Sequence, residues 1–398
     1  MVDKFPQVLA PFSPEEFFSS VWGKEFLHVE GRPGKFSRLF SWAALNEVLS
    51  RNMLDAPRLR LMRDRLYVPP ESFLKHTQSR RDFRKFTPHI QPSAVMAEIR
   101  RGATLLIDNV EELHQPINEL AAGFERTFHE RVQVTVYASY RASSAFGVHA
   151  DDHDVFVLQV AGRKRWTLYG ASPAGLYPDP AAVAAKTPVW EGALEEGDVL
   201  YMPRGWLHTA VALDEPALHI TFGVFNSTGA DLMRWFIQHS AAGQILHRDL
   251  PRFASKAEQG AYMKELREGL AGAWDESLLE QFFDYSDKMA GPRPYFSLPW
   301  AATDDLPQSD ETLLRLTTRR PLNMRASADG KTITFSANAR QWEVPAAAAP
   351  ILRALEDSPA CSVTELYRAT GEGHPPQAVR DLLKQLLTQG LVAVSSGD

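Results

Sequence analysis

The sequence predicts an α+β protein in which a β-barrel or β-sandwich domain is followed by a helical region and a small mixed C-terminal domain. Short apolar strands separated by turns fill residues 132–225, whereas charged helical segments fill residues 229–299. Many short strands with a two-residue period indicate a sandwich or a barrel. Because a chain of 398 residues is too long for one ordinary core, we expect three domains, at residues 1–228, 229–305 and 306–398.

The first 130 residues are predicted to mix helices with short strands. Ser13 as N-cap, Pro14 in the first turn and Glu16 at the third position mark the start of a helix in "FSPEEFFSSVWGKEF". The segments "FLHVEG", "RLYV" and "ATLLID" are expected to be strands, and "INELAAGFERTF" is expected to be a helix. This part of the chain therefore elaborates the barrel on its N-terminal side.

The barrel itself is predicted from seven alternating or continuously apolar segments. These are "VQVTVYASY", "DVFVLQVAG", "KRWTLYG", "PVWEGAL", "GDVLYMPRG", "HTAVAL" and "ALHITFGVF". Their lengths and the turn residues between them are typical of antiparallel strands.

The region after the barrel is predicted to be helical and then mixed. "LMRWFIQ" and "LLEQFFDY" each carry more apolar surface than one helix packed on a barrel needs, which favours a dimerisation region and a homodimer, with intramolecular packing as the alternative. After Pro299, strands "KTITFSA" and "RQWEVP" precede three helices and a last strand, "GLVAVSS". A capping box of Ser362 and Glu365 starts the middle helix, and Gly390 ends the last one. That order resembles a winged helix.

Composition and charge exclude several classes of protein. A content of 44% apolar and 23% charged residues is typical of soluble globular proteins, and a net charge of -6 argues against a protein that coats nucleic acid. The single cysteine, Cys361, excludes an intramolecular disulfide framework and fits a reducing compartment. The start "MVDKFPQVLAPF" does not look like a signal peptide, and no apolar run is long enough to cross a membrane. We therefore expect a cytoplasmic protein.

A metal site is predicted where charge precedes a buried strand, in "FGVHADDHDVFVLQV". If the strand is regular, His149 and Asp151 face the same side, into the barrel. An imidazole and a carboxylate are two thirds of the 2-His-1-carboxylate triad that leaves positions open on Fe(II). A divalent ion would also explain why a carboxylate is tolerated there. The alternative is a surface turn, and we expect His153 at the rim and Asp154 as a turn cap.

The third ligand is predicted in "EEGDVLYMPRGWLHTAV". Gly197, Pro203, Gly205 and His208 follow the order Gly-x5-Pro-x-Gly-x2-His, which is the second motif of the cupin barrel and presents its histidine inward. Alone, His208 could equally be a hydrogen-bonded core histidine. Its agreement with the independent His-x-Asp pattern favours a metal site.

A buried cation is predicted one strand further along, in "GRKRWTLYG". Alternation puts Lys164 on the same face as Trp166 and Leu168, so its ammonium needs an anion there to offset the cost of desolvation. The alternative is a basic turn in which all the cations are solvated. Two hydroxyls are further candidates for ligand contacts, Tyr137 and Thr221, although hydroxyls in barrels often bond only to nearby backbone.

These residues together resemble the JmjC-type 2-oxoglutarate oxygenases, and within them the bacterial ribosomal oxygenase (Cupin_4) branch. The likeness lies in "TVYASYRASSAFGVHADDHDVFVLQVAGRKRWTLYG" and "LEEGDVLYMPRGWLHTAV". It implies a jelly-roll (cupin) catalytic domain, a helical dimerisation region and a C-terminal winged helix. It also implies that Fe(II) is bound by His149, Asp151 and His208, that 2-oxoglutarate is bound by Lys164, and that O2 is consumed. Where the family often has prolines before the first histidine, this chain has "YRASSAFGVH", so the lip facing the substrate is expected to differ.

The function expected from this resemblance is hydroxylation of an arginine or histidine side chain of a ribosomal protein. Two alternatives stay open: another peptide or a natural-product precursor as substrate, and a winged-helix regulator whose barrel binds a ligand. A metal cupin that works without 2-oxoglutarate is a third. The helix "PQAVRDLLKQLL" carries Arg380 and Lys384 but also Asp381, and this balance of charge disfavours direct DNA binding.

Overall fold

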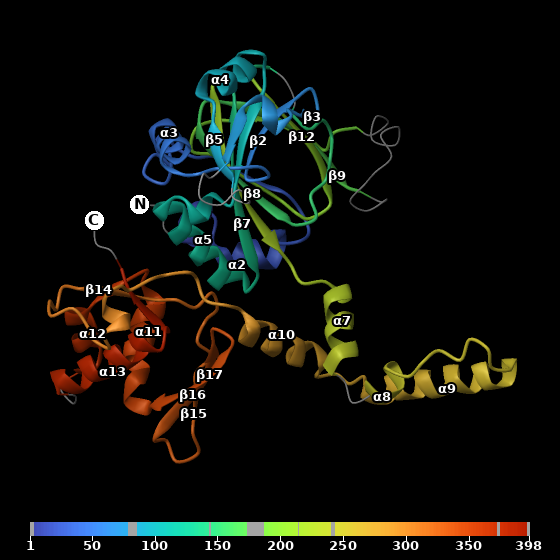
Figure 1. The fold of residues 1–398 in the computed structure, drawn as a ribbon, viewed down its shortest axis with the longest axis vertical. Coiled ribbons are helices and arrows are strands. Elements are labelled where there is room, and N and C mark those ends of the chain that lie inside the picture. Colours follow the sequence, from blue (N-terminus) through green and yellow to red (C-terminus); the bar gives the residue numbers. More distant parts are fainter. Residues whose placement is uncertain are drawn as a thin grey trace. The chain divides into compact units, whose positions relative to one another are not determined.

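The computed structural model describes residues 4–78, 86–142, 145–172, 187–213, 215–239, 243–371 and 375–395. The chain divides into two units, Met1–Asn226 and Ser227–Asp398 (Figure 1). The predicted candidate site falls entirely within the first unit.

The first unit is built on two antiparallel sheets. Among the described residues the larger sheet has eight strands in the order β1-β11-β8-β13-β7-β6-β2-β3, and the smaller has three in the order β10-β9-β12. The larger sheet consists of β1 (Leu27–Val29), β2 (Leu59–Arg63), β3 (Leu66–Tyr67), β6 (Thr104–Asp108), β7 (Arg131–Ser139), β8 (Asp154–Ala161), β11 (Val199–Met202) and β13 (Ala217–Phe225). The smaller sheet consists of β9 (Lys164–Ala171), β10 (Trp190–Leu194) and β12 (Trp206–Ala212).

These strands confirm the predicted barrel segments, and several of them pair with strands that are distant along the chain. β13 pairs with both β7 and β8, and β11 lies between β8 and β1. The pairing of β9 with β12 brings Leu168 beside His208, with an irregularity in register at Leu207. A separate hairpin is formed by β4 (Leu74–Gln78) and β5 (Phe86–Ile90).

Alternation along β7 separates the hydrophobic core from the polar interior of the barrel. Val132, Val134 and Val136 are buried in the main core, whereas residues 133, 135 and 137 line a cavity on the other face. This is the two-residue period of a strand with one apolar and one polar face. The polar face of β7 therefore forms part of the floor of the candidate site.

Helices cover the apolar face of the larger sheet. In chain order these elements are α1 (Phe5–Leu9), α2 (Pro14–Glu16), η1 (Phe17–Val21), α3 (Trp42–Arg51), η2 (Pro70–Ser72), α4 (Pro92–Arg100), η3 (Val110–Glu112) and α5 (Gln115–Phe128). The predicted cap is confirmed, because Ser13 Oγ accepts from the Glu16 amide at 3.1 Å, and the helix continues as the π-turn η1. Phe5, Phe17 and Phe124 pack edge-on against one another or against Phe156 of β8.

The tight turn between β10 and β11 depends on Gly197. Its φ of +97° is a conformation that other residues rarely adopt, and a Cβ there would lie 2.2 Å from the Arg32 carbonyl oxygen. Gly205 also has a positive φ, of +80°, in the turn that leads into β12. Gly197 thus allows the turn that enters β11, and Gly205 allows the short connection from β11 to β12, the strand that presents His208.

The second unit begins with helices and ends in a mixed domain. Its elements are α7 (Gly229–His239), α8 (Gly243–Leu246), α9 (Lys256–Ala273), α10 (Leu278–Met289), η4 (Trp300–Ala302), β14 (Leu313–Leu316), β15 (Arg325–Ala326), β16 (Thr332–Ala337), β17 (Arg340–Pro345), η5 (Ala346–Ala348), α11 (Ala349–Asp357), β18 (Cys361–Ser362), α12 (Val363–Ala369), α13 (Pro376–Thr388) and β19 (Val392–Val394). The described strands form two three-stranded sheets, β18-β14-β19 and β15-β16-β17. The predicted capping box is confirmed, since Ser362 Oγ accepts from the Glu365 amide at 3.1 Å.

None of the described helices combines the length and the apolar character that a membrane span requires.

Candidate active site

A cavity of about 380 Å³ lies between the two sheets of the first unit. Side chains of both sheets and of the segment before β8 line it: Arg60, Asp108, Gln133, Thr135, Tyr137, Ala145, Phe146, Gly147, His149, Asp151, His153, Val155, Lys164, Trp166, His208, Ala210, His219, Thr221, Gly223 and Phe225. All six predicted site residues are in this set. Residues that are more than 70 positions apart in the sequence thus share one interior.

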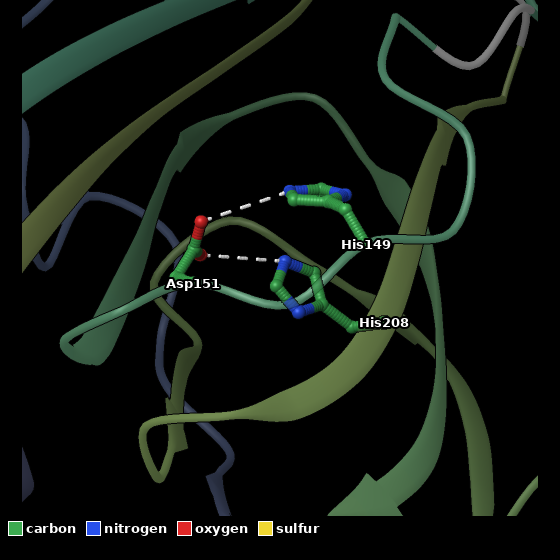
Figure 2. A group of neighbouring side chains, drawn as sticks. All are labelled: His149, Asp151 and His208. Carbon is green, nitrogen blue, oxygen red and sulfur yellow. Dashed lines mark ion pairs between the residues drawn. The ribbon is translucent and has the colours of Figure 1, made fainter. Parts of the chain in front are cut away.

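The three predicted metal ligands converge on a common point. Asp151 Oδ1 lies 3.9 Å from His149 Nε2, and Asp151 Oδ2 lies 3.6 Å from His208 Nε2 (Figure 2). One ligand atom from each residue lies within 4.8 Å of the other two. An ion with ligand distances of about 2.1 Å spans ligand-to-ligand separations of roughly 3–4 Å, so a small closure of these side chains would complete such a site.

The route by which His149 and Asp151 reach this point differs from the prediction. They do not belong to a regular strand, because β8 begins only at Asp154. Instead His149 forms an isolated bridge with His208, and their amides and carbonyls exchange hydrogen bonds of 3.0 and 2.8 Å. The main chain of β12 therefore fixes His149 next to His208, and the Gly205 amide, which donates to the Asp151 carbonyl at 2.9 Å, holds Asp151 beside the same strand.

Backbone carbonyls orient both imidazoles for metal binding. His149 Nδ1 lies 3.2 Å from the Gly147 oxygen, and His208 Nδ1 lies 2.9 Å from the Trp206 oxygen. Because a carbonyl only accepts, each Nδ1 carries the hydrogen and each Nε2 keeps its lone pair. Burial lowers the pKa of His208 to about 4, with the neighbouring His149 acting in the same direction, so that the imidazole of His208 is neutral at physiological pH.

Of the two residues next to the cluster, His153 lies at the cavity wall and Asp154 does not have its predicted role. His153 lines the cavity wall, where it stacks on Phe225 at 4.4 Å and contacts Asp152 at 2.9 Å. The predicted role of Asp154 as a turn cap is wrong, because its carboxylate is buried and accepts hydrogen bonds from Tyr201 Oη, at 2.5 Å, and from Asn226 Nδ2. Burial raises the pKa of Asp154, and its two donors, from β11 and from the residue after β13, are distant in the sequence.

Lys164 occupies the inner end of the cavity as a desolvated cation. Alternation along β9 buries Lys164, Trp166 and Leu168 and exposes Arg165, so the alternative of a fully solvated basic turn is wrong. Lys164 Nζ lies 3.3 Å from Ser139 Oγ, and no ion pair links it to a carboxylate of the described residues. Burial lowers the pKa of Lys164 to about 7. An anion placed here would restore the charge that desolvation disfavours.

Two further polar groups near Lys164 were not found from the sequence. His219 Nδ1 and Trp166 Nε1 are both shielded from solvent, and neither has a hydrogen-bond partner within the described part of the chain. His219 faces Tyr137 with ring centroids 4.7 Å apart and planes at 4°, and burial, followed by the charge of Lys164, lowers the pKa of His219. Unsatisfied buried polar atoms are costly, so their presence beside a lone cation indicates a polar ligand.

The two predicted hydroxyl residues lie on adjacent strands of the cavity floor. Tyr137 and His219 are paired across β7 and β13, and Thr221 is paired with Thr135 one step nearer the outer end. Burial, followed by the charges of Asp151 and Asp108, raises the pKa of Tyr137, which keeps its phenol protonated. Tyr137 is therefore a neutral group between the inner cation and the carboxylates.

The outer floor contains an ion pair that the sequence analysis missed. Arg60 of β2 donates from Nη2 to Asp108 of β6 at 2.6 Å, and Thr135 Oγ1 donates to the same carboxylate at 3.0 Å. In the sequence, Asp108 is 48 positions from Arg60 and 27 positions from Thr135. No short motif joins them, and only the order of strands β2, β6 and β7 brings them together.

The site as a whole fits a divalent metal and a small dicarboxylate. The two imidazoles and one carboxylate leave further coordination positions towards the cavity, which is the arrangement of the facial triad. The buried cation and the unpaired donors lie at the inner end of the same space. This combination puts a candidate metal site beside a candidate anion site in one cavity.

A family model described as JmjC domain matches residues 112–232 of this chain. The matched segment runs from η3 to α7 and contains the three converging side chains together with Lys164. With the two facing sheets and the His-Asp-His cluster, this part of the chain is similar to JmjC domains.

Curated relatives share the same region. The chain is 28% identical over 266 residues to the bifunctional lysine-specific demethylase and histidyl-hydroxylase NO66 of Aedes aegypti, covering 63% of this chain and 39% of that protein. It is 30% identical over 255 residues to the protein of the same name from Drosophila grimshawi, covering 60% and 33%. This chain thus spans well under half the length of these relatives.

Solved structures share the fold over nearly the whole chain. Escherichia coli YcfD, described as a ribosomal oxygenase, matches with a TM-score of 0.56 and 19% identity over 97% of this chain and 99% of that chain. A structure of YcfD with cobalt and 2-oxoglutarate matches with a TM-score of 0.54 over 96% and 98%. At this identity the likeness establishes a common fold.

Proposed function

We propose that this protein is an Fe(II)- and 2-oxoglutarate-dependent oxygenase that hydroxylates a side chain of a protein, with an arginine or histidine of a ribosomal protein as the substrate. The observation that carries this proposal is the placement of the His149, Asp151 and His208 cluster and the buried Lys164 in one cavity. The printed names of the relatives, a histidyl-hydroxylase and a ribosomal oxygenase, support the substrate class.

In the proposed reaction the chain supplies binding, orientation and exclusion of water. His149, Asp151 and His208 would hold the iron, which when bound supplies the chemistry of oxygen activation with 2-oxoglutarate as cosubstrate and O2 as oxidant. Lys164 would bind the distal carboxylate of 2-oxoglutarate, and the unpaired donors of Trp166 and His219 lie in the same wall. The two sheets that line the cavity would restrict the access of bulk water to the reacting atoms.

Tyr137 and Thr221 are proposed to contribute hydroxyl groups to this site. Tyr137 lies 6.0 Å from Lys164 Nζ, measured to its ring centroid, so a ligand bound by the lysine comes within reach of the phenol. Thr221 lies further out on β13 and is suited to the substrate side.

The lip segment whose sequence departs from the family includes residues 143–144, which lie outside the described residues.

The proposal is tested by oxygenation of protein substrates. The protein is incubated with Fe(II), ascorbate, 2-oxoglutarate and purified ribosomal proteins or their peptides, and intact masses are measured. We expect one added oxygen on one polypeptide and an equal amount of succinate, both dependent on 2-oxoglutarate. Succinate formation without any added oxygen on a protein would contradict the proposed substrate class, and no succinate at all would contradict the proposed reaction.

A homodimer assembled through the helical region is also part of the proposal. Within the described residues of the 18-residue helix α9, the one buried side chain is Tyr262, and Phe253 just before it is 97% exposed. On α10, Leu279 and Phe283 lie four positions apart on one face and are 51% and 50% exposed. Such a surface is typical of an interface, and a second copy of the chain is the occupant we propose.

Light scattering after size exclusion is expected to give twice the chain mass of 44.5 kDa. Replacing both Leu279 and Phe283 by Asp should produce a monomer, because two charges would be desolvated in the interface. The control Glu280→Gln, at an exposed position of the same helix, should stay dimeric. A wild-type protein that elutes as a monomer at micromolar concentration would contradict this part of the proposal.

The C-terminal domain is proposed to be a winged helix that packs or docks a peptide. Its helices α11, α12 and α13 accompany the sheet β18-β14-β19, and α13 is the helix that would face DNA in a regulator. Arg380 of α13 donates to Asp310 at 2.7 Å and to the Pro307 carbonyl, so its charge is neutralised within the domain. This pairing argues against the regulator alternative.

The free, buried thiol of Cys361 is consistent with the cytoplasmic location that we propose.

A further inference from the structure

The outer floor of the cavity holds a carboxylate, Asp108, that is already paired with a cation. Arg60 Nη2 lies 2.6 Å from each oxygen of Asp108, and Thr135 Oγ1 donates a hydrogen bond to it at 3.0 Å. Arg60 is itself held from its other side, because Nη1 donates to the Tyr67 hydroxyl at 2.8 Å. The side chains of Arg60 and Asp108 are 22% and 18% exposed, so the pair is only partly reached by solvent. The arrangement is a built feature of the wall and not a loose surface contact.

The neighbours of this pair are uncharged. Thr135 is paired with Thr221 across β7 and β13, and Gln133 is paired with Gly223 one step further out. All four line the cavity. Asp108 is paired with Thr135 across β6 and β7, two residues from Tyr137, and the Arg60–Asp108 pair lines the same cavity as Tyr137 and Asp151. Among the described residues that line the cavity, the carboxylates are Asp151 and Asp108, and Asp108 is already paired with Arg60.

The remaining charges of the proposed reaction balance without the substrate. A divalent ion and Lys164 together match Asp151 and the two carboxylates of 2-oxoglutarate. The Arg60–Asp108 pair adds no net charge. A guanidinium or ammonium entering this space would lose its hydration beside a fixed cation, without a carboxylate to offset the loss.

We infer that Arg60 is a specificity-determining residue: by occupying Asp108 it makes the substrate wall neutral, so that the site accepts an uncharged, hydrogen-bonding side chain such as an imidazole or an amide and rejects arginine and lysine. This inference rests on the proposed function and decides between its two side chains in favour of histidine. It assigns to β2 a role in substrate selection.

The test uses peptide mixtures with randomised flanking positions and a central residue that is His, Gln, Arg or Lys. Wild-type protein with Fe(II) and 2-oxoglutarate is expected to add oxygen to the His or Gln mixtures at least about tenfold more than to the Arg and Lys mixtures. Arg60→Met keeps the apolar stem but frees Asp108, and this preference should fall by about tenfold or reverse. Retention of the same mixtures on immobilised protein, without O2 and with Mn(II) and 2-oxoglutarate, should show the same shift.

Two variants separate charge selection from a general effect on folding. Arg58→Met is the matched control, because Arg58 pairs with Glu112 and does not line the cavity, and its preference should equal that of the wild type. Asp108→Asn leaves Arg60 without its counter-charge and should reject cationic peptides more strongly than the wild type does. Equal oxygenation of Arg and His mixtures by the wild type, or an unchanged ratio in Arg60→Met, would overturn the inference. Failure of the wild type to form succinate with any mixture would reject instead the proposed function on which it rests.

Discussion

His208→Ala is expected to abolish 2-oxoglutarate-dependent turnover, with a loss of at least about 100-fold, because removal of a direct ligand exceeds the 10–100-fold cost of losing a group that merely orients one. The neutral Nε2 of His208 lies 3.6 Å from Asp151, and loss of it leaves one imidazole and one carboxylate. Succinate release measures the activity, and calorimetry with Mn(II) measures metal affinity without turnover. Both should fall together.

Controls distinguish a lost ligand from a lost fold. His208 is buried, so its replacement can also destabilise the barrel, whereas the side chain of His149 is 35% exposed. His149→Ala should therefore lose metal binding while its thermal unfolding stays close to that of the wild type. His76→Ala removes a histidine that contacts Asp55 outside the cavity and should change neither quantity. Full turnover in both His149→Ala and His208→Ala would refute the ligand set.

Lys164→Met is expected to raise the KM for 2-oxoglutarate by about 10–100-fold and to leave kcat at saturation less affected. A hydrogen bond to a charged group is worth roughly 1.5–3 kcal/mol, and an interaction present in both the ground state and the transition state changes KM more than kcat. Arg165→Met, on the exposed face of the same strand, should behave as the wild type. Intact activity of Lys164→Met without any need for 2-oxoglutarate would favour a metal cupin of another kind.

The pH dependence of 2-oxoglutarate binding follows from the same residue. Burial lowers the pKa of Lys164 to about 7 in the empty site, so the cation is lost as the pH rises through that value. A bound carboxylate favours the protonated form, and binding should therefore weaken above pH 7, by up to about tenfold per pH unit, and stay constant below it. Calorimetry at a series of pH values should show this dependence in the wild type and its absence in Lys164→Met.

The local sequence predicted the barrel strands and the residue types of the candidate metal site. Alternation along β9 correctly put Lys164 on the buried face, since a period of two residues is a property of the strand itself. The spacing of Gly197, Gly205 and His208 predicted an inward histidine, because a positive φ at the turn restricts which residues can occupy it. The sequence thus predicts the orientation of a side chain where that orientation depends on backbone geometry over only a few residues.

Only the tertiary structure decided which distant side chains share the cavity. Asp154 looked like a turn cap but is buried against Tyr201, and His149 faces the cluster through a bridge to His208 rather than through strand alternation. The Arg60–Asp108 pair could not be predicted, because the order of strands β2, β6 and β7 is set by packing of the whole sheet. The local sequence determines the side of a strand on which a side chain lies, because alternation is a property of the strand. Its contacts depend on long-range strand pairing, which packing of the whole sheet determines.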